Sequence, residues 1–222
     1  MSILSTNLMQ MYWQQGNASR LPDGYREVAY IESDGNQWID TGVAMSSNLT
    51  MTMQMQYTVI GSAQQSGVGL NGNPWMRFTM GTTRENSTSP YNFVCCLGAN
   101  IVITTVPMDT NLHTLTLNAS TGVFQVDLQS FYTTPAIFSS SNTVYLMAVN
   151  MDYLGVYNSC KAKFYSAKLD IYATALRDFI PCVRIADTKP GLYDNCGSIC
   201  TLTNSPFYVN SGTGTDFTWA EL

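Results

Sequence analysis

Charged residues and long apolar runs are both scarce in this sequence. Only 11% of its 222 residues are Asp, Glu, Lys or Arg, against roughly 25% in an ordinary soluble domain. No segment approaches the roughly 20 consecutive apolar residues of a membrane span. Residues 1–20 lack the basic start and apolar run of a secretory signal peptide. We therefore expect neither a membrane-spanning segment nor a cleaved signal.

Clustered positive charge is also missing. The chain has 10 Lys and Arg against 15 Asp and Glu, a formal net charge of −5 and a pI near 4.6. Every lysine falls in the last third of the chain, at Lys161, Lys163, Lys168 and Lys189. Because nucleic-acid affinity depends on clustered cations that neutralise phosphates, we do not expect nucleic-acid binding.

The chain offers little for nucleophilic catalysis. A Ser-His-Asp triad or a Cys-His dyad needs a histidine as its base, and His113 is the only histidine. It has the same strand parity as Leu115 and Leu117, so we interpret it as a partly buried residue on the face that they define.

Paired carboxylates and phosphate loops are missing as well. Glycan cleavage needs two carboxylates about 5–10 Å apart, and the one acid-x-acid pair, Glu32 and Asp34, straddles an expected turn. Residues 61–72 are glycine-rich but lack the Gly-Lys-Ser/Thr ending of a phosphate loop. We interpret them, and the Gly-x-Gly of residues 211–217, as loops between strands. No enzymatic activity, catalytic residue, metal or cofactor is expected.

The cysteines have no recognisable metal-site spacing. A vicinal pair, two single residues and a C-x3-C do not match the paired C-x2-C of a zinc site. Without a signal peptide, reduced thiols acting as small core residues are the favoured interpretation. The six are Cys95, Cys96, Cys160, Cys182, Cys196 and Cys200.

The sequence does contain many runs in which apolar and polar residues alternate, as is typical of β-strands. Residues 49–59, LTMTMQMQYTV, alternate so that Leu49, Met51, Met53, Met55, Tyr57 and Val59 share one face. Similar runs occur at 27–33, 37–42, 75–80, 100–106, 112–117, 123–129, 143–149, 163–173 and 177–185. Turn residues separate them, and residues 174–179 could form one helical turn. Roughly ten to twelve short strands predict a β-sandwich or jelly roll.

Residues 1–20 differ from the rest. Apolar residues stand there at helical spacing: Leu4, Leu8, Met11 and Tyr12. Such a stripe could lie on its own domain or dock onto a neighbouring subunit, and both alternatives stay open. We therefore predict an N-terminal arm over residues 1–20 and one jelly-roll β-sandwich domain over residues 21–222.

Residues 21–42, LPDGYREVAYIESDGNQWIDTG, resemble the opening of a laminin-G-like, concanavalin A-type jelly-roll domain common in gut-bacterial surface proteins and their phages. Members begin with a Leu-Pro-x-Gly-Tyr turn and continue with V-x-Y-I/L-E-S-x-G-x-Q-Y/W-I-D-T-G. We interpret this stretch as the first hairpin, turning at Asp34-Gly35-Asn36, with Asp40-Thr41-Gly42 as the exit turn of its second strand.

The closing residues resemble the same family. They contain R-D-F-I-P at 177–181, G-L-Y-D at 191–194 and F-Y-x-N-x-G-T-G at 207–214. Residues 112–117 resemble the family's W-H-x-V-x-L strand, with Leu112 in place of the Trp. The resemblance spans about residues 21–217. It implies a fold more than an activity, because lectin-like relatives bind glycans whereas related glucanases carry an acid triad that is missing here.

The resemblance implies a non-enzymatic structural protein of a phage virion: a head decoration, head-fibre or tail-fibre component. Residues 1–20 would dock on other virion proteins, and the jelly roll would face outward for host attachment. A homo-oligomer is expected, with a trimer as the working guess. The alternative is a carbohydrate-binding module at the bacterial cell surface, and a glycoside hydrolase is a distant third.

A host-surface glycan is the expected small ligand. Sugar sites combine aromatic faces with amide and charged hydrogen-bonding groups, and two segments supply them. For Trp75, packing in the core is the favoured alternative. The candidate ligand-binding residues are Asn71, Asn73, Trp75, Arg77, Tyr91 and Asn92.

Overall fold

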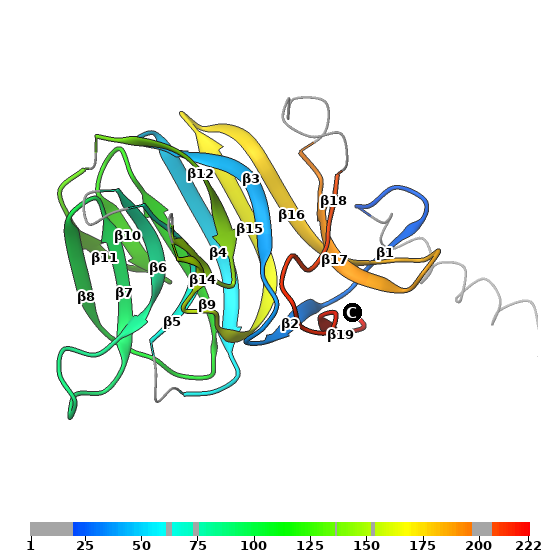
Figure 1. The fold of residues 1–222 in the computed structure, drawn as a ribbon, viewed down its shortest axis with the longest axis horizontal. Coiled ribbons are helices and arrows are strands. Elements are labelled where there is room, and N and C mark those ends of the chain that lie inside the picture. The colour runs from blue at the N-terminus through cyan, green and yellow to red at the C-terminus, as the bar shows by residue number, and fades with distance from the viewer. Residues whose placement is uncertain (1–19, 61–63, 73–75, 136, 152–153, 197–205) are drawn as a thin grey trace, which may run out of the picture.

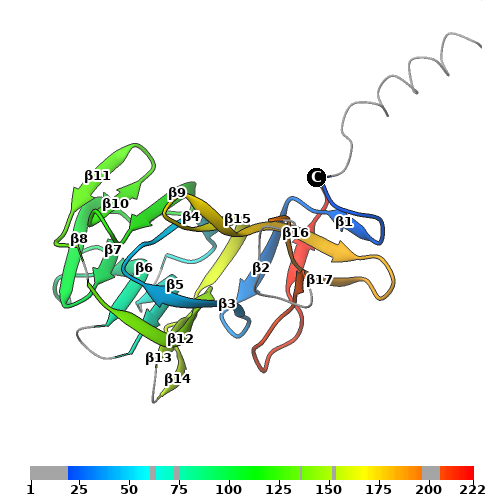
Figure 2. The same cartoon turned by 90° about the horizontal axis from the view of Figure 1, so that it is seen from above.

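Two β-sheets packed face to face make up the molecule (Figures 1 and 2). The computed structural model describes residues 20–60, 64–72, 76–135, 137–151, 154–196 and 206–222. The larger sheet has eleven strands. Its main path runs β11 (Gln129–Tyr132), β10 (Val123–Val126), β9 (Leu112–Asn118), β4 (Leu49–Tyr57), β15 (Lys161–Ile171), β16 (Thr174–Arg184), β17 (Lys189–Asp194) and β18 (Phe207–Tyr208). Beside it, β1 (Tyr25–Glu27) pairs with β16, and β2 (Tyr30–Asp34) pairs with β15 and β19 (Thr218–Ala220).

The smaller sheet has eight strands. Its order is β14 (Gly155–Tyr157), β13 (Val149–Met151), β5 (Gln65–Asn71), β6 (Arg77–Thr83), β7 (Asn92–Leu97) and β8 (Asn100–Pro107), with β12 (Ser139–Leu146) joining β5 to β3 (Ile39–Ser46). The pairs formed by the described residues are antiparallel, apart from β13 on β5. In the described part of the chain the fold is therefore an all-β sandwich of two sheets, as the alternating runs predicted.

Strand β4 shows how the sequence specifies the core. Leu49, Met51, Met53, Met55 and Tyr57 are almost completely buried against the smaller sheet, and the Thr and Gln residues between them face outward. Burial of each apolar side chain stabilises the fold by roughly 1.5–3 kcal/mol. Val59 was expected on the same face, but it lies beyond the end of the strand and is half exposed.

The opening motif does not form a hairpin, which corrects the sequence-based prediction. Strand β2 pairs with β15 and β19 in the larger sheet, whereas β3 pairs with β12 in the smaller one. The Asp34-Gly35-Asn36 turn therefore carries the chain from one sheet to the other. Gln37 stabilises it, because its side-chain oxygen accepts hydrogen bonds from Asp34 N at 2.8 Å and Ser33 Oγ at 3.1 Å.

The Asp-Thr-Gly segment lies inside β3 and is not the exit turn of that strand. Asp40 Oδ1 accepts a hydrogen bond from Gly42 N at 2.9 Å, a local bond of the kind that the sequence suggested. Thr41 is buried, and its hydroxyl donates to Val144 O at 2.7 Å. The motif thereby holds β3 against β12 within the smaller sheet.

Two further segments differ from their predicted conformation. Residues 61–72 were expected to be a loop, yet β5 is an inner strand of the smaller sheet. A Cβ atom at Gly67 would overlap Met55 Sδ, so glycine lets this strand approach the core closely. Residues 174–179 form part of β16, not a helical turn, because they pair with β15 and Phe179 also pairs with β17.

A buried ion pair explains two of the closing motifs. Arg177, from R-D-F-I-P, is completely buried, and its Nε lies 3.5 Å from Oδ2 of Asp194, the last residue of G-L-Y-D. The same Nε donates to Thr41 O at 3.1 Å, and Nη1 donates to Leu176 O at 2.7 Å. Asp194 Oδ1 accepts from Asp178 N at 2.9 Å. Arg177 thus connects β16 and β17 of the larger sheet with β3 of the smaller sheet.

The third closing motif packs against the opening one. Asn210 Oδ1 accepts hydrogen bonds from Trp38 N at 3.3 Å and Gly212 N at 2.7 Å. Gln37 Nε2 donates to Thr215 O at 3.1 Å. The two ends of the resemblance, distant in sequence, are therefore one structural unit.

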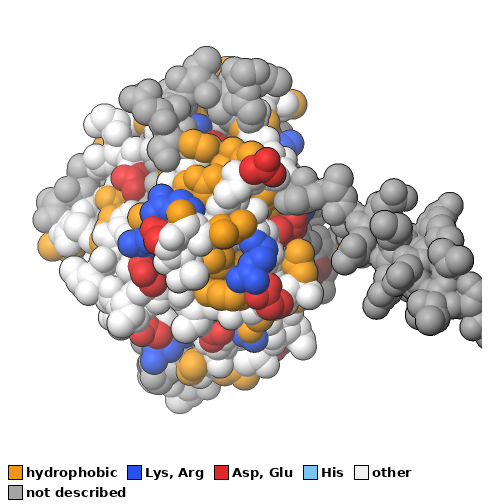
Figure 3. All heavy atoms as spheres, turned by 90° about the vertical axis from the view of Figure 1, so that its right-hand side faces the viewer, with side chains coloured by type: hydrophobic (Ala, Val, Ile, Leu, Met, Phe, Trp, Pro, Cys, Tyr) orange, Lys and Arg blue, Asp and Glu red, His pale blue; other side chains and the backbone are white. Residues whose placement is uncertain are grey.

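A second apolar cluster lies where the larger sheet extends beyond the smaller one (Figures 1 and 3). Ring centroids of Tyr25 lie 4.9 Å from Tyr193 and 5.2 Å from Phe207. Figure 3 shows apolar side chains gathered at this end with charges of both signs around them. The buried members are Leu21, Ile180, Cys182 and Phe207, with Tyr25, Tyr193 and Val209 packed against them.

The cysteine prediction is wrong at one position. Cys95, Cys96, Cys160 and Cys182 are free and buried, as small core residues should be. Burial raises the pKa of the Cys160 thiol to about 12, which keeps it protonated. Cys196, however, is disulfide-bonded, and its backbone N donates to Asp194 Oδ1 at 3.2 Å.

The predicted arm residues, Leu4, Leu8, Met11 and Tyr12, lie outside the described part of the chain. Within the described part, no helix is long and apolar enough to cross a membrane.

We predict that Asp194→Ala lowers the free energy of unfolding by about 3–5 kcal/mol, because it leaves the buried Arg177 charge without its partner. Urea denaturation monitored by tryptophan fluorescence measures the loss. The matched control is Asp187→Ala, which removes one partner of the exposed Arg184–Asp187 pair and should cost far less, because water screens exposed charges. Equal losses in the two variants would contradict the structural role given to Arg177 and Asp194.

Candidate functional site

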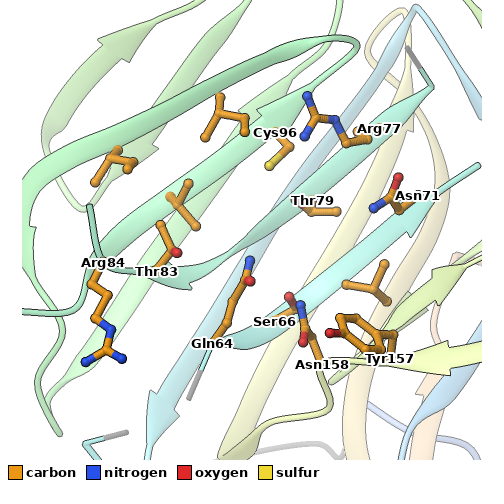
Figure 4. A pocket seen from close by; sticks show the side chains of 14 residues that line it. Gln64, Ser66, Asn71, Arg77, Thr79, Thr83, Arg84, Cys96, Tyr157 and Asn158 are labelled. Atoms are coloured by element: carbon orange, nitrogen blue, oxygen red, sulfur yellow. The ribbon is translucent and has the colours of Figure 1, made fainter. Parts of the chain in front are cut away.

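A hollow on the outer face of the smaller sheet is the main candidate site (Figure 4). Its volume is about 400 Å³, within the range of small-ligand sites. Strands β5, β6, β7, β8, β13 and β14 all contribute to it. Because the core lies on the opposite side of this sheet, side chains in the hollow are not needed to hold the two sheets together.

Strand alternation selects which side chains reach the hollow. Along β6, Phe78 and Met80 point into the core, whereas Arg77, Thr79 and Thr83 point outward. The neighbouring strands follow the same rule. The other lining residues are Gln64, Ser66, Asn71, Arg84, Val94, Cys96, Ile101, Ile103, Val149, Tyr157 and Asn158.

Gly69 contributes to the depth of the hollow. It faces the same side as Thr79, its partner across the β5–β6 pair. A Cβ atom at Gly69 would lie 2.7 Å from Thr79 Cγ2 and 3.0 Å from Val149 Cγ2. Any side chain at this position would therefore push against the floor.

The hollow mixes hydrogen-bonding and apolar surface. Ser66, Thr79 and Thr83 supply hydroxyls that can donate and accept, and Asn71 and Asn158 supply amides. Tyr157 of β14 brings an aromatic ring, about half exposed, to one wall. The described residues that line the hollow include no Asp, Glu or His. Such a surface can bind a polyhydroxylated molecule, but it lacks the carboxylate pair of glycoside hydrolysis.

Of the four predicted ligand-binding residues that the structure describes, two line the hollow and two do not. Asn71, at the end of β5, and Arg77, at the start of β6, both line the hollow (Figure 4). Tyr91 and Asn92 do not; Tyr91 packs partly against the core, and Asn92 pairs with Thr83 at the start of β7. Asn73 and Trp75 lie outside the described residues.

Sequence reasoning missed most of the site. The alternation of residues 77–83, with Arg77, Thr79 and Thr83 on one face, was a usable signal for the outer surface of β6. Ser66 could not be found, since residues 61–72 were taken for a loop. Tyr157 and Asn158 come from a distant segment that the β13–β5 pairing and a hydrogen bond from Ser66 N to Asn158 O, at 2.9 Å, bring to the hollow.

A smaller hollow of about 270 Å³ lies between the opening turn and the C-terminal segment. Trp38 lines it and stacks on Tyr145, with ring centroids 4.1 Å apart and an interplanar angle of 25°. Ser159 Oγ donates a hydrogen bond to Gly35 O at its rim. Since the larger hollow has more room and more hydrogen-bonding side chains, we consider it the better candidate.

His113 is held between two carboxylates away from the hollow. Nδ1 lies 2.8 Å from Asp127 Oδ2 and Nε2 lies 2.8 Å from Asp109 Oδ1, and the ring packs against Phe93. Burial opposes protonation of the ring, but the hydrogen bonds and charges of the two carboxylates outweigh it and raise the pKa of His113. Both nitrogens are thus occupied, and the residue faces inward with Leu115, as predicted.

Among the described residues, no group of three or more His, Cys, Asp or Glu side chains could hold a metal ion.

The raised pKa of His113 predicts a pH-dependent contribution to stability. The stabilisation is complete below the unfolded-state pKa of about 6.5 and disappears as the pH rises through the folded-state pKa. His113→Gln should therefore reduce the free energy of unfolding more at about pH 5.5 than at about pH 9. Denaturant titrations at several pH values measure the difference between the two proteins. A difference that stays constant across this range would contradict the predicted direction.

Comparisons with known proteins add little to this geometry. No family model and no curated protein sequence matches the chain. Among solved structures, it is similar to the native heptameric SAP-like pentraxin from Limulus polyphemus, with 8% sequence identity and a TM-score of 0.43. The match covers 64% of this chain and 74% of the pentraxin chain. We take neither a ligand nor an oligomeric state from a likeness this distant.

Proposed function

We propose that this chain is a non-enzymatic, lectin-like structural protein of a phage virion that uses the hollow of the smaller sheet to bind a host-surface glycan. The observation that carries the glycan-binding part is the hollow itself, which combines hydroxyl, amide and aromatic groups in a volume of about 400 Å³. Its position on the outer face leaves it open to a large ligand.

The virion part of the proposal rests on the sequence. Motifs at both ends resemble the laminin-G-like jelly rolls of gut-bacterial surface proteins and their phages. In this proposal residues 1–20 dock on other virion proteins, and the jelly roll assembles as a homo-oligomer, with a trimer as the working guess.

A carbohydrate-binding module of a bacterial surface protein is the second candidate, supported by the same hollow. The two candidates differ in location and agree on the ligand class. A glycoside hydrolase has less support, because the described residues of the hollow include no carboxylate; release of reducing sugar from host polysaccharide would favour it.

We predict that Tyr157→Ala weakens glycan binding about fivefold, since an aromatic face in a sugar site contributes on the order of 1 kcal/mol. The measurement is a glycan array followed by calorimetric titration of the best ligand. Tyr132→Ala is the matched control, because Tyr132 is exposed on β11, outside the hollow. The proposal of glycan binding fails if the array shows no signal above background, and the hollow is the wrong site if both variants behave alike.

We predict that mass spectrometry detects this chain in purified virions, in near-constant stoichiometry to the major capsid or tail proteins. A variant lacking residues 1–20 should be lost from the particles while remaining folded by circular dichroism, because the predicted arm provides the docking contact. Detection in the host cell envelope, and not in virions, would replace the virion proposal with the surface-module alternative.

A further inference from the structure

The arginines of this chain divide into paired and unpaired groups. Four form ion pairs: Arg20 with Glu27, Arg26 with Glu221, Arg177 with Asp194, and Arg184 with Asp187. The other two, Arg77 and Arg84, both line the hollow. In the described part of the chain, neither has a carboxylate within ion-pair distance. The unpaired guanidinium groups are therefore concentrated at the candidate site.

Both side chains are held in place without being neutralised. Arg77 Nε donates to Gly98 O at 3.0 Å and Nη2 donates to Ala99 O at 2.5 Å, which fixes the group against the β7–β8 turn. The guanidinium carbon of Arg84 lies 5.3 Å from the ring centroid of Tyr91, and Nη1 donates to Ser87 O at 3.0 Å. These contacts leave N–H donors on each arginine, and every acceptor named here is a neutral carbonyl. The positive charges persist.

The charge around the hollow contrasts with that of the whole protein. The chain carries a formal charge of −5 with 15 acidic residues, yet the described lining residues include two arginines and no acid. Glu85 follows Arg84 in sequence but does not line the hollow. A local positive potential in an acidic protein attracts anions to that place and repels them elsewhere.

The two arginines lie at opposite ends of the hollow (Figure 4). Arg77 begins β6, and Arg84 follows its last residue, Thr83, so the two Cα atoms are separated by roughly 20 Å of extended strand. Between them lie Thr79, Ser66 and Asn158, whose hydroxyl and amide groups suit neutral hydroxyls. An elongated ligand with negative groups more than one residue apart matches this arrangement better than a small anion does.

We propose that the hollow binds an acidic glycan chain, whose carboxylate or sulfate groups contact Arg77 and Arg84 while its hydroxyls contact the polar side chains between them. This inference rests on the proposed glycan-binding function and adds the chemical class of the ligand. Guanidinium groups form short, charge-assisted hydrogen bonds with both kinds of anion. A nucleic acid is the disfavoured polyanion, because two separated cations do not form the clustered basic surface that it requires.

The test compares four ligands by calorimetric titration with the full-length protein. They are oligogalacturonate, the same oligosaccharide after reduction of its carboxyl groups, a sulfated dextran oligosaccharide, and single-stranded DNA. We expect at least one acidic glycan to bind at least tenfold more tightly than the carboxyl-reduced oligosaccharide, and its affinity to fall as salt is added. The two acidic ligands distinguish carboxylate from sulfate as the recognised group.

Substitutions of single arginines test whether the preference for the acidic glycan arises in the hollow. Arg84→Gln should weaken binding of the acidic glycan about fivefold and leave binding of the carboxyl-reduced ligand within about twofold. Arg84→Lys, which retains the charge, should recover part of the loss. Arg26→Gln is the matched control, because it removes an exposed arginine that pairs with Glu221 outside the hollow.

The outcomes distinguish failure of the acidic-glycan inference from failure of the proposed glycan-binding function. Equal affinity for the acidic and reduced ligands, with no effect of Arg84→Gln, would overturn the acidic-glycan inference and leave glycan binding intact. Failure of all glycans to bind would overturn both. Tighter binding of DNA than of either acidic glycan would also overturn the inference, and so would an equal effect of Arg26→Gln and Arg84→Gln.

Discussion

The ion pair between Arg177 and Asp194 is the constraint on which the junction of the two sheets depends. A charge with no exposed surface is tolerated only with a partner of opposite charge and hydrogen bonds around it. Both charges come from neighbouring strands of the larger sheet, and Thr41 of the smaller sheet supplies a carbonyl. The contacts of this arginine therefore tie β16, β17 and β3 to one another.

The motifs by which the chain resembles a family are structural, and the candidate site uses none of them. The opening and closing motifs contribute Gln37, Asn210 and the buried ion pair. The larger hollow is lined instead by residues of segments 64–103 and 149–158. These motifs consequently explain contacts that hold the fold together and say little about a ligand. The hydroxyl, amide and guanidinium groups of the hollow are the features that indicate a ligand.

The sequence predicted the elements whose information is local. Alternation identified β4, and strand parity placed His113 inward beside Leu115. Predictions were wrong where long-range contacts decide the outcome. A turn at residues 34–36 is compatible with a hairpin or with a crossing between sheets, and the pairing of β2 with β15 selects the crossing. Strand β5 was missed because glycines usually indicate a loop, whereas here Gly67 and Gly69 relieve close packing. For the site, Asn71 and Arg77 were found, but the residues from β14 depend on a remote pairing.

The two ends of the described chain lie together, because Ala29 N donates to Ala220 O at 2.9 Å and Arg26 pairs with Glu221. Of the strands that line the hollow, β7 and β8 lie at the other extremity of the molecule (Figures 1 and 2). This arrangement gives the molecule a directional polarity. A tether at either end of the described chain, whether a solid support in an assay or a larger assembly, holds the protein by one pole and displays the opposite pole to its surroundings.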